Sequence, residues 1–144
     1  MGSYSYPVFK NCTALSMVTI GENVKNIPGS AFKGCTGLTS IEIPNSVTSI
    51  GDSAFAGCSR LTNIVIGNSV TKIGDYVFSG CKKLTEISSL NPTPPKIDSL
   101  STFYNIGTNG ILKVPKGSDY NEWMRTITFY LGYYNWTIEE IETV

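Results

Sequence analysis

The chain has 144 residues, enough for a single domain with a continuous hydrophobic core. Its 11 lysine and arginine residues balance 11 aspartate and glutamate residues, so it lacks the basic excess typical of nucleic-acid-binding proteins. It contains no histidine, the commonest general base and metal ligand, and no apolar run of the roughly 18 residues that span a bilayer.

A repeat organises the first two thirds of the chain. Cysteine recurs every 23 residues (35 − 12 = 23), and phenylalanine and leucine recur at the same step. The positions are Cys12, Cys35, Cys58 and Cys81, then Phe9, Phe32, Phe55 and Phe78, and finally Leu15, Leu38, Leu61 and Leu84. Such a period is typical of a solenoid, in which each coil packs only on its neighbours. We expect one domain over 1–144, with regular repeats over about 6–90 and a degenerate coil and cap over about 91–144.

Each repeat predicts two short strands and a turn that returns the chain to the next coil. In the unit 38–60, apolar residues alternate across Ile41–Ile43, which is the pattern of a half-buried strand. The β-branched pair within 47–50 predicts a second strand on the opposite side of the coil. The segment 52–58 then turns the chain back. The first copy predicts the same first strand over 15–20.

The repeat resembles a known family. The pattern I-P-x-S-V-T-x-I-G-x-x-A-F-x-G-C-x-x-L-T, which begins at Ile43, is similar to the BspA-like leucine-rich repeat. The resemblance implies a mainly β, right-handed coil with parallel strands, in a protein secreted by a bacterium or held at its surface. Asn23 of the first copy gives way to Ser46 and Ser69, whose hydroxyl groups we expect to bond the turn backbone.

Beyond residue 90 the repeat loses its register. Three prolines lie within 92–95, and a hydrogen-bonded central strand does not tolerate them. We expect a strand over Ile111–Pro115, a helix that begins at Ser118 as N-cap, and a closing strand over Trp136–Ile141. These elements form a small α+β cap, which resembles the C-terminal end of many gut-bacterial BspA-like proteins. A cap covers the core and the sheet edge of a last coil.

The spacing of the cysteines indicates a packing role in the core rather than a metal site or disulfides. Zinc sites use close pairs such as C-x-x-C, and a 23-residue ladder contains none. Stacked cysteines with parallel Cβ vectors have poor geometry for disulfides. We therefore favour buried thiols that act as small hydrophobic side chains, over a disulfide ladder or a metal site. No cofactor is predicted. Without histidine, no serine or cysteine triad is complete, which argues against an enzyme.

The outward side chains of the first strand of each repeat are the candidate partner-binding residues. They vary between copies, and in leucine-rich repeats this sheet face is concave and often holds a protein. The residues are Met17, Thr19, Ser40, Glu42, Asn63, Val65, Glu86 and Ser88. We predict a binding or adhesion module for an extracellular or host protein, placed at the cell surface or secreted. A solvated face without a ligand, and a structural spacer or accessory domain, are the alternatives.

Aromatic residues near the C-terminus give a further alternative. Exposed tyrosine and tryptophan rings stack on sugars, which would make the cap a glycan-binding site. The residues are Tyr120, Trp123, Phe129, Tyr130, Tyr133, Tyr134 and Trp136. We favour the interpretation that most of them pack the cap.

Overall fold

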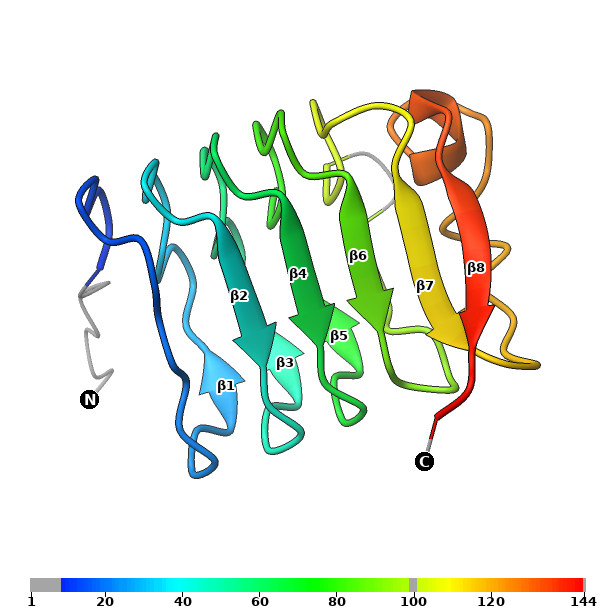
Figure 1. Ribbon diagram of the computed structural model, residues 1–144, viewed down its shortest axis with the longest axis horizontal. Helices are drawn as coiled ribbons and strands as arrows, with labels where there is room; N and C mark the ends of the chain where they lie inside the picture. Colours follow the sequence, from blue (N-terminus) through cyan, green and yellow to red (C-terminus); the bar gives the residue numbers. More distant parts are fainter. Residues whose placement is uncertain (1–8, 99–100, 144) are drawn as a thin grey trace.

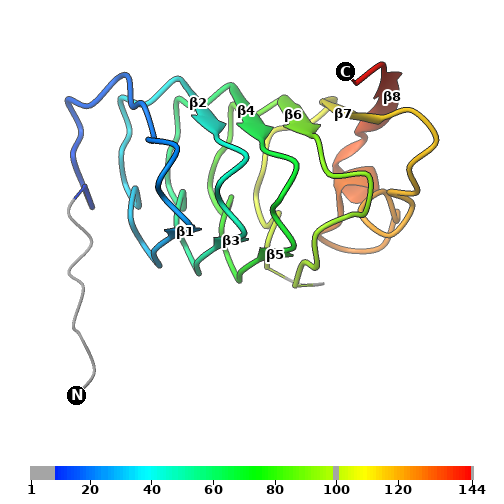
Figure 2. The same cartoon turned by 90° about the horizontal axis from the view of Figure 1, so that it is seen from below.

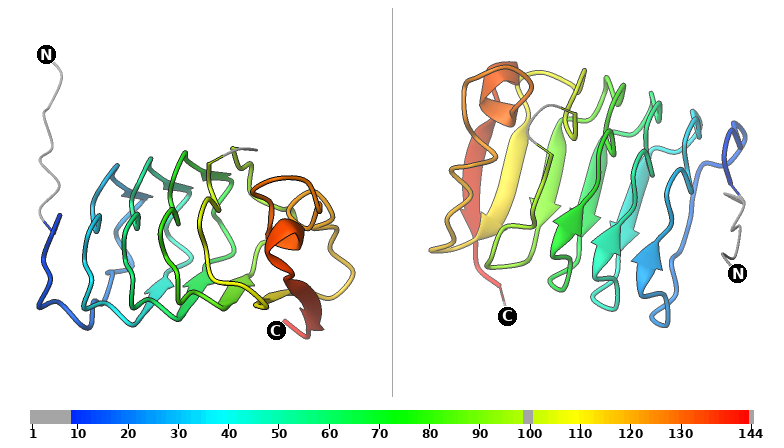
Figure 3. Two further views of the ribbon diagram at one scale, coloured as in Figure 1. Left: turned by 90° about the horizontal axis from the view of Figure 1, so that it is seen from above. Right: turned by 180° about the vertical axis from the view of Figure 1, so that it is seen from behind.

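The protein is a parallel β-solenoid of about five turns, which confirms the predicted fold class (Figure 1). The computed structural model describes residues 9–98 and 101–143. Each coil crosses from a long front sheet to a short back sheet, and the two sheets lie on opposite sides of the coils (Figures 2 and 3). The hydrophobic core fills the space between them.

All strand pairs in the two sheets are parallel. The front sheet has the order β2-β4-β6-β7-β8, with β2 Ser40–Ile43, β4 Asn63–Ile66, β6 Glu86–Ser89, β7 Ile111–Pro115 and β8 Thr137–Ile141. The back sheet has the order β1-β3-β5, with β1 Asn26–Ile27, β3 Ser49–Ile50 and β5 Lys72–Ile73. The repeats that begin at Leu38 and Leu61 therefore contain both expected strands, β2 with β3 and β4 with β5.

The repeat period places identical side chains on top of one another in the core. Ile41 pairs with Ile64, which pairs with Ile87, and all three are buried. The phenylalanine rings stack nearly parallel at 5.4–6.3 Å between centroids, and the stack includes Phe9, Phe32, Phe55, Phe78 and Phe103. Because each ring covers its neighbour, a coil buries its core only when another coil stacks on it.

The cysteines form a ladder of thiols. The Sγ atoms of Cys35, Cys58 and Cys81 lie 2.9, 3.2 and 3.1 Å from the carbonyl oxygens of the phenylalanines 26 positions earlier, and each thiol donates to that oxygen. Burial raises the pKa of Cys58 to about 12, and it also raises the pKa of Cys81. The prediction of buried thiols is confirmed for these three residues. Cys12 lies in the first coil and is partly exposed.

The first coil differs from its prediction. Residues 17–20 form no strand, although their apolar spacing matches β2. The amide of Thr62 donates to the carbonyl of Thr39, and the later coils repeat this bond, but none of the described residues links the first coil to β2 in this way. Val18 and Ile20 are only half-buried. Within the described residues this coil packs against a neighbour on one side only, so its side chains stabilise the strand less.

The helix predicted from Ser118 is wrong. Residues 121–124 form turns, and among the described residues the helical segment is the short 3-10 helix η1, Leu131–Tyr134. An N-cap hydroxyl accepts a bond from an amide in the first helical turn. The Ser118 hydroxyl instead donates to the carbonyl oxygen of Pro115 at 2.6 Å, which closes a turn. The cap therefore contains β-strands, turns and η1.

The solenoid continues past the proline-rich segment with longer coils. Ile87 of β6 pairs with Leu112 (112 − 87 = 25), and Leu112 pairs with Ile138 (138 − 112 = 26). The expected strands over 111–115 and near the C-terminus are confirmed as β7 and β8. Burial does not alternate along β8, because β8 is the edge strand and most of it is exposed.

The two serines that replace Asn23 behave differently from the prediction. The Ser46 hydroxyl is buried and has no hydrogen-bond partner among the residues that the structure describes, and the Ser69 hydroxyl donates to the side chain of Asn68 at 3.2 Å. The turn backbone is bonded by the preceding residue instead. The Asn45 side-chain oxygen accepts a bond from the amide of Asn68, one coil later, at 2.8 Å.

Candidate functional site

The outward side chains of the front sheet form two parallel rows, which we call the outer face. Strand register sets both rows, because residues that pair across strands point to the same side. The first row contains Ser40, Asn63, Glu86, Ile111 and Thr137. The second row contains Glu42, Val65, Ser88, Lys113 and Glu139. Each row thus runs from the regular repeats into the cap.

Four residues of the outer face were not predicted from the sequence, namely Ile111, Lys113, Thr137 and Glu139. The alternation in Ile111–Pro115 did predict a strand there. What the sequence left open was its neighbour and register, because the spacing to β6 is no longer 23 residues. Once Ile87 is seen to pair with Leu112, the outward position of Lys113 follows from strand alternation.

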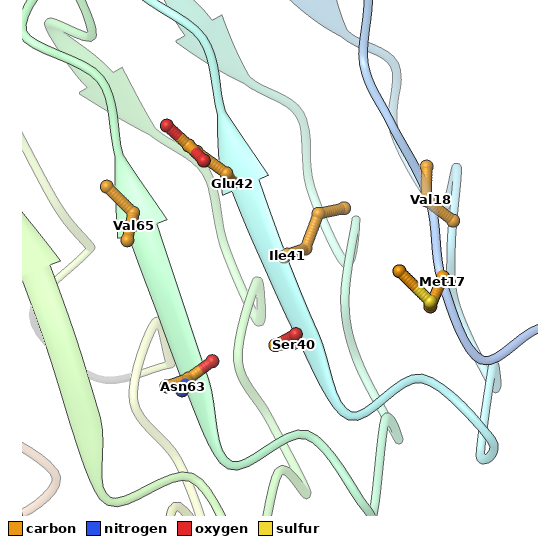
Figure 4. Close-up of a pocket in the computed structure, with 7 residues that line it drawn as sticks. All are labelled: Met17, Val18, Ser40, Ile41, Glu42, Asn63 and Val65. Atoms are coloured by element: carbon orange, nitrogen blue, oxygen red, sulfur yellow. The ribbon is translucent and has the colours of Figure 1, made fainter.

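A hollow of about 250 Å³ lies at the N-terminal end of the outer face (Figure 4). It is lined by Met17, Val18, Ser40, Ile41, Glu42, Asn63 and Val65. Five of the eight predicted partner-binding residues are among them. The Met17 side chain extends toward β2 and is 83% exposed (Figure 4). Because residues 17–20 do not pair with β2, the space between them also reaches the inward residues Val18 and Ile41.

A second hollow of about 230 Å³ adjoins the first along the same gap. It is lined by Val18, Thr19, Ile20, Glu22, Glu42 and Pro44. Thr19, a sixth predicted partner-binding residue, lines this hollow. Glu42 belongs to both hollows, and no ion pair involves it within the described residues. The two hollows combine exposed apolar surface with the carboxylates of Glu22 and Glu42.

Glu86 and Ser88 lie apart from these hollows. The Glu86 carboxylate forms an ion pair with the ammonium group of Lys113, at 2.6 Å between Oε1 and Nζ. The hydrogen bond to Glu86, and then its charge, raise the pKa of Lys113. Glu86 was predicted as a partner-binding residue, but its carboxylate is already occupied by a neighbour on the sheet.

Most aromatic residues of the cap are core residues, as favoured from the sequence. Tyr120, Trp123, Tyr130 and Trp136 are at most 4% exposed. The indole N–H of Trp123 donates to the carbonyl of Pro95 at 3.1 Å, and that of Trp136 donates to the carbonyl of Gly107 at 2.7 Å. These bonds satisfy the polar atoms of the two indole rings. Because all four side chains are buried, they are not free to stack on a sugar.

Within residues 9–98 and 101–143, no three histidine, cysteine, aspartate or glutamate side chains lie where they would hold a metal ion together. The same part of the chain includes no helix with the length and apolar character that a membrane crossing requires.

Comparison with known proteins identifies the repeat. The BspA type leucine-rich repeat region matches residues 3–117, in six copies. Neither the curated proteins nor the solved structures include a match to the chain. The family match spans more than half of the 144 residues, and it covers the same coils that stack in the solenoid. The chain therefore belongs to the BspA type leucine-rich repeat family.

Proposed function

We propose that this chain is a non-enzymatic binding module, secreted or at the bacterial cell surface, that holds a protein partner on its outer face. The observation that carries the proposal is the hollow beside β2, which gathers five independently predicted residues. The family is generally implicated in binding and adhesion, and its members are often associated with the cell surface.

The lining of the hollows indicates the chemistry of the partner. Met17 is a large apolar side chain that is 83% exposed, and exposed apolar groups beside polar ones are typical of protein interaction sites. Glu42 stands at the junction of both hollows with Glu22 nearby. A partner that fits presents an apolar side chain flanked by lysine or arginine. Glu86 contributes less, because Lys113 already neutralises it.

The test compares variants of the hollow with a matched charge change elsewhere. Binding is measured on immobilised extracellular-matrix and host-cell-surface proteins. Met17→Asp and Glu42→Lys should each weaken binding about tenfold, equivalent to about 1.4 kcal/mol. Glu142→Lys is the control, because it makes the same charge change at an exposed site outside the hollows. Its affinity should stay within about twofold of the unmodified chain.

Two results would count against the proposal. If no immobilised protein is retained at micromolar concentration, a spacer or accessory domain that presents another module becomes the better interpretation. If a protein is retained but all three variants bind it equally well, the partner contacts a surface other than the hollows.

A further inference from the structure

Positive charge is concentrated at one corner of the coils. We call this corner the cysteine corner, and it comprises residues 9–16, 32–39, 55–62 and 78–85 in the four regular coils. These segments contain five cationic residues and no aspartate or glutamate. The five are Lys10, Lys33, Arg60, Lys82 and Lys83. Because the whole chain has equal numbers of cationic and acidic residues, this concentration is local.

Stacking of the coils aligns four of these cations in two pairs. The corner forms the row of turns along the upper edge of the solenoid in Figure 1. Lys10 and Lys33 hold equivalent positions in successive coils, as do Arg60 and Lys83 (83 − 60 = 23). Neighbouring parallel strands lie about 4.8 Å apart, so four coils place the cations within about 15 Å along the axis. All five side chains are exposed, and within the described residues none forms an ion pair.

The acidic residues of the regular coils lie outside this corner. Glu42 lies on β2, and Asp52 and Asp75 come three residues before the segments that begin at Phe55 and Phe78. Glu86 lies closest to the corner along the chain, but its carboxylate is paired with Lys113. The corner therefore presents a row of positive charge to solvent.

The row ends in a cluster of aromatic rings and amide groups. In the next coil, Tyr104 packs edge-to-face on Phe129 at 4.9 Å, and Phe129 packs on Tyr133 at 6.0 Å. Tyr104 is 42% exposed and Tyr133 is 52% exposed. The side-chain amide of Asn135 donates to Asn109 at 2.6 Å, next to η1, which lies beside the coil that follows the row (Figure 1).

We infer that the cysteine corner and this cluster together bind an acidic polysaccharide. The cations suit the sulfate or carboxylate groups of a linear polymer, because each of the four coils offers at least one positive charge. The exposed rings suit the faces of sugar rings, and the amides of Asn109 and Asn135 suit their hydroxyl groups. A single-stranded nucleic acid fits less well, since its bases need aromatic rings along the cations and here the rings lie at one end.

The test removes three cations from the corner and, in a control, three from elsewhere. The corner variant is Lys33→Gln/Arg60→Gln/Lys83→Gln, and the control is Lys25→Gln/Lys72→Gln/Lys96→Gln, whose lysines are equally exposed. Affinity for heparin is measured by calorimetry between 50 and 200 mM NaCl. The corner variant should bind about tenfold more weakly or worse and lose part of the salt dependence. The control variant should keep both the heparin affinity and the salt dependence of the unmodified chain.

Further measurements separate the contribution of the rings from that of the cations. Tyr133→Ala should weaken heparin binding without changing its salt dependence, because it removes a ring and no charge. Binding to hyaluronan as well as heparin would show that carboxylate groups on the polymer suffice.

Equal weakening of heparin binding in the corner and control variants would overturn the proposal. So would the absence of heparin binding at 50 mM NaCl, or equally tight binding to a DNA oligonucleotide. Thermal unfolding of each variant, together with the single variants Arg60→Gln and Lys72→Gln, excludes loss of fold as the cause.

Discussion

Close backbone stacking decides which residues are accepted at several positions of the coil. A Cβ atom on Gly51 would lie 2.5 Å from the amide nitrogen of Gly29 and 2.9 Å from the carbonyl carbon of Pro28. Both neighbours are backbone atoms of the preceding coil, so they have little freedom to move. Gly74 holds the same position one coil later. Glycine is needed there because two coils meet.

Replacing Gly51 with alanine should therefore destabilise the protein. We expect Gly51→Ala to lower the free energy of unfolding by about 1–3 kcal/mol, the usual cost of forcing extra atoms into packed backbone. Gly21→Ala is the matched control, because a Cβ at Gly21 would have no atom of the described residues within 4 Å. Urea-induced unfolding of both variants checks this. Equal stability of the two would show that the coils separate easily at Gly51.

At the scale of single elements, β6 shows how the cap is joined to the repeats. Ser89 occupies the position of Ile43 in β2 and Ile66 in β4, and it is fully buried. Its hydroxyl lies 2.8 Å from that of Tyr120, which donates to the carbonyl of Asn91 at 2.6 Å. Tyr120 is a large buried ring, so a smaller residue at position 89 leaves room for it.

Replacing Ser89 with isoleucine, the residue that β2 and β4 have at this position, should destabilise the protein. Ser89→Ile is expected to lower the free energy of unfolding by about 1–3 kcal/mol, because it crowds Tyr120 and removes a hydrogen bond to its hydroxyl. Ser88→Ile provides the comparison, since Ser88 points outward on the same strand and is only half-buried. Thermal or urea unfolding distinguishes them. A stabilised Ser89→Ile protein would mean that the cap repacks around isoleucine.

At the scale of the whole molecule, burial of ionisable groups sets the stability at alkaline pH. Burial raises the pKa of Cys58 from 9.0 to about 12 and that of Tyr120 from 10.0 to about 12. The unfolded chain releases these protons at lower pH than the folded chain does. The contribution of these protonated side chains to the stability of the folded state is therefore complete below about pH 9, and it is lost as pH rises toward 12.

The free energy of unfolding should fall above pH 9, by about 1.4 kcal/mol per pH unit for each such group within its window. Urea unfolding from pH 7 to pH 11 measures this slope. The variants Cys58→Ala and Tyr120→Phe should each have a shallower slope than the unmodified chain, whatever their stability at pH 7. Slopes that match the unmodified chain would assign the alkaline loss to other groups.

The sequence alone determined the fold class, the strands from β1 to β6 and the inward residues, because every regular coil buries its core against a neighbouring coil of the same shape. A core shared between identical neighbours requires the same side chain at the same step, so the 23-residue period already contains the register. It also determined the outward positions of the regular coils, since strand alternation follows from the inward ones.

The tertiary structure alone decided how these outward residues group. The hollows exist because residues 17–20 leave one edge of β2 unpaired. Glu86 lies outside them on β6, where Lys113, 27 residues later (113 − 86 = 27), neutralises it. The cap lacks its predicted helix: Tyr120 and Trp123 are both buried in the core, but Tyr120 lies in an irregular segment and Trp123 in a turn, so they share no helical face. These outcomes depend on contacts between segments that share no period, and local sequence patterns do not encode such contacts.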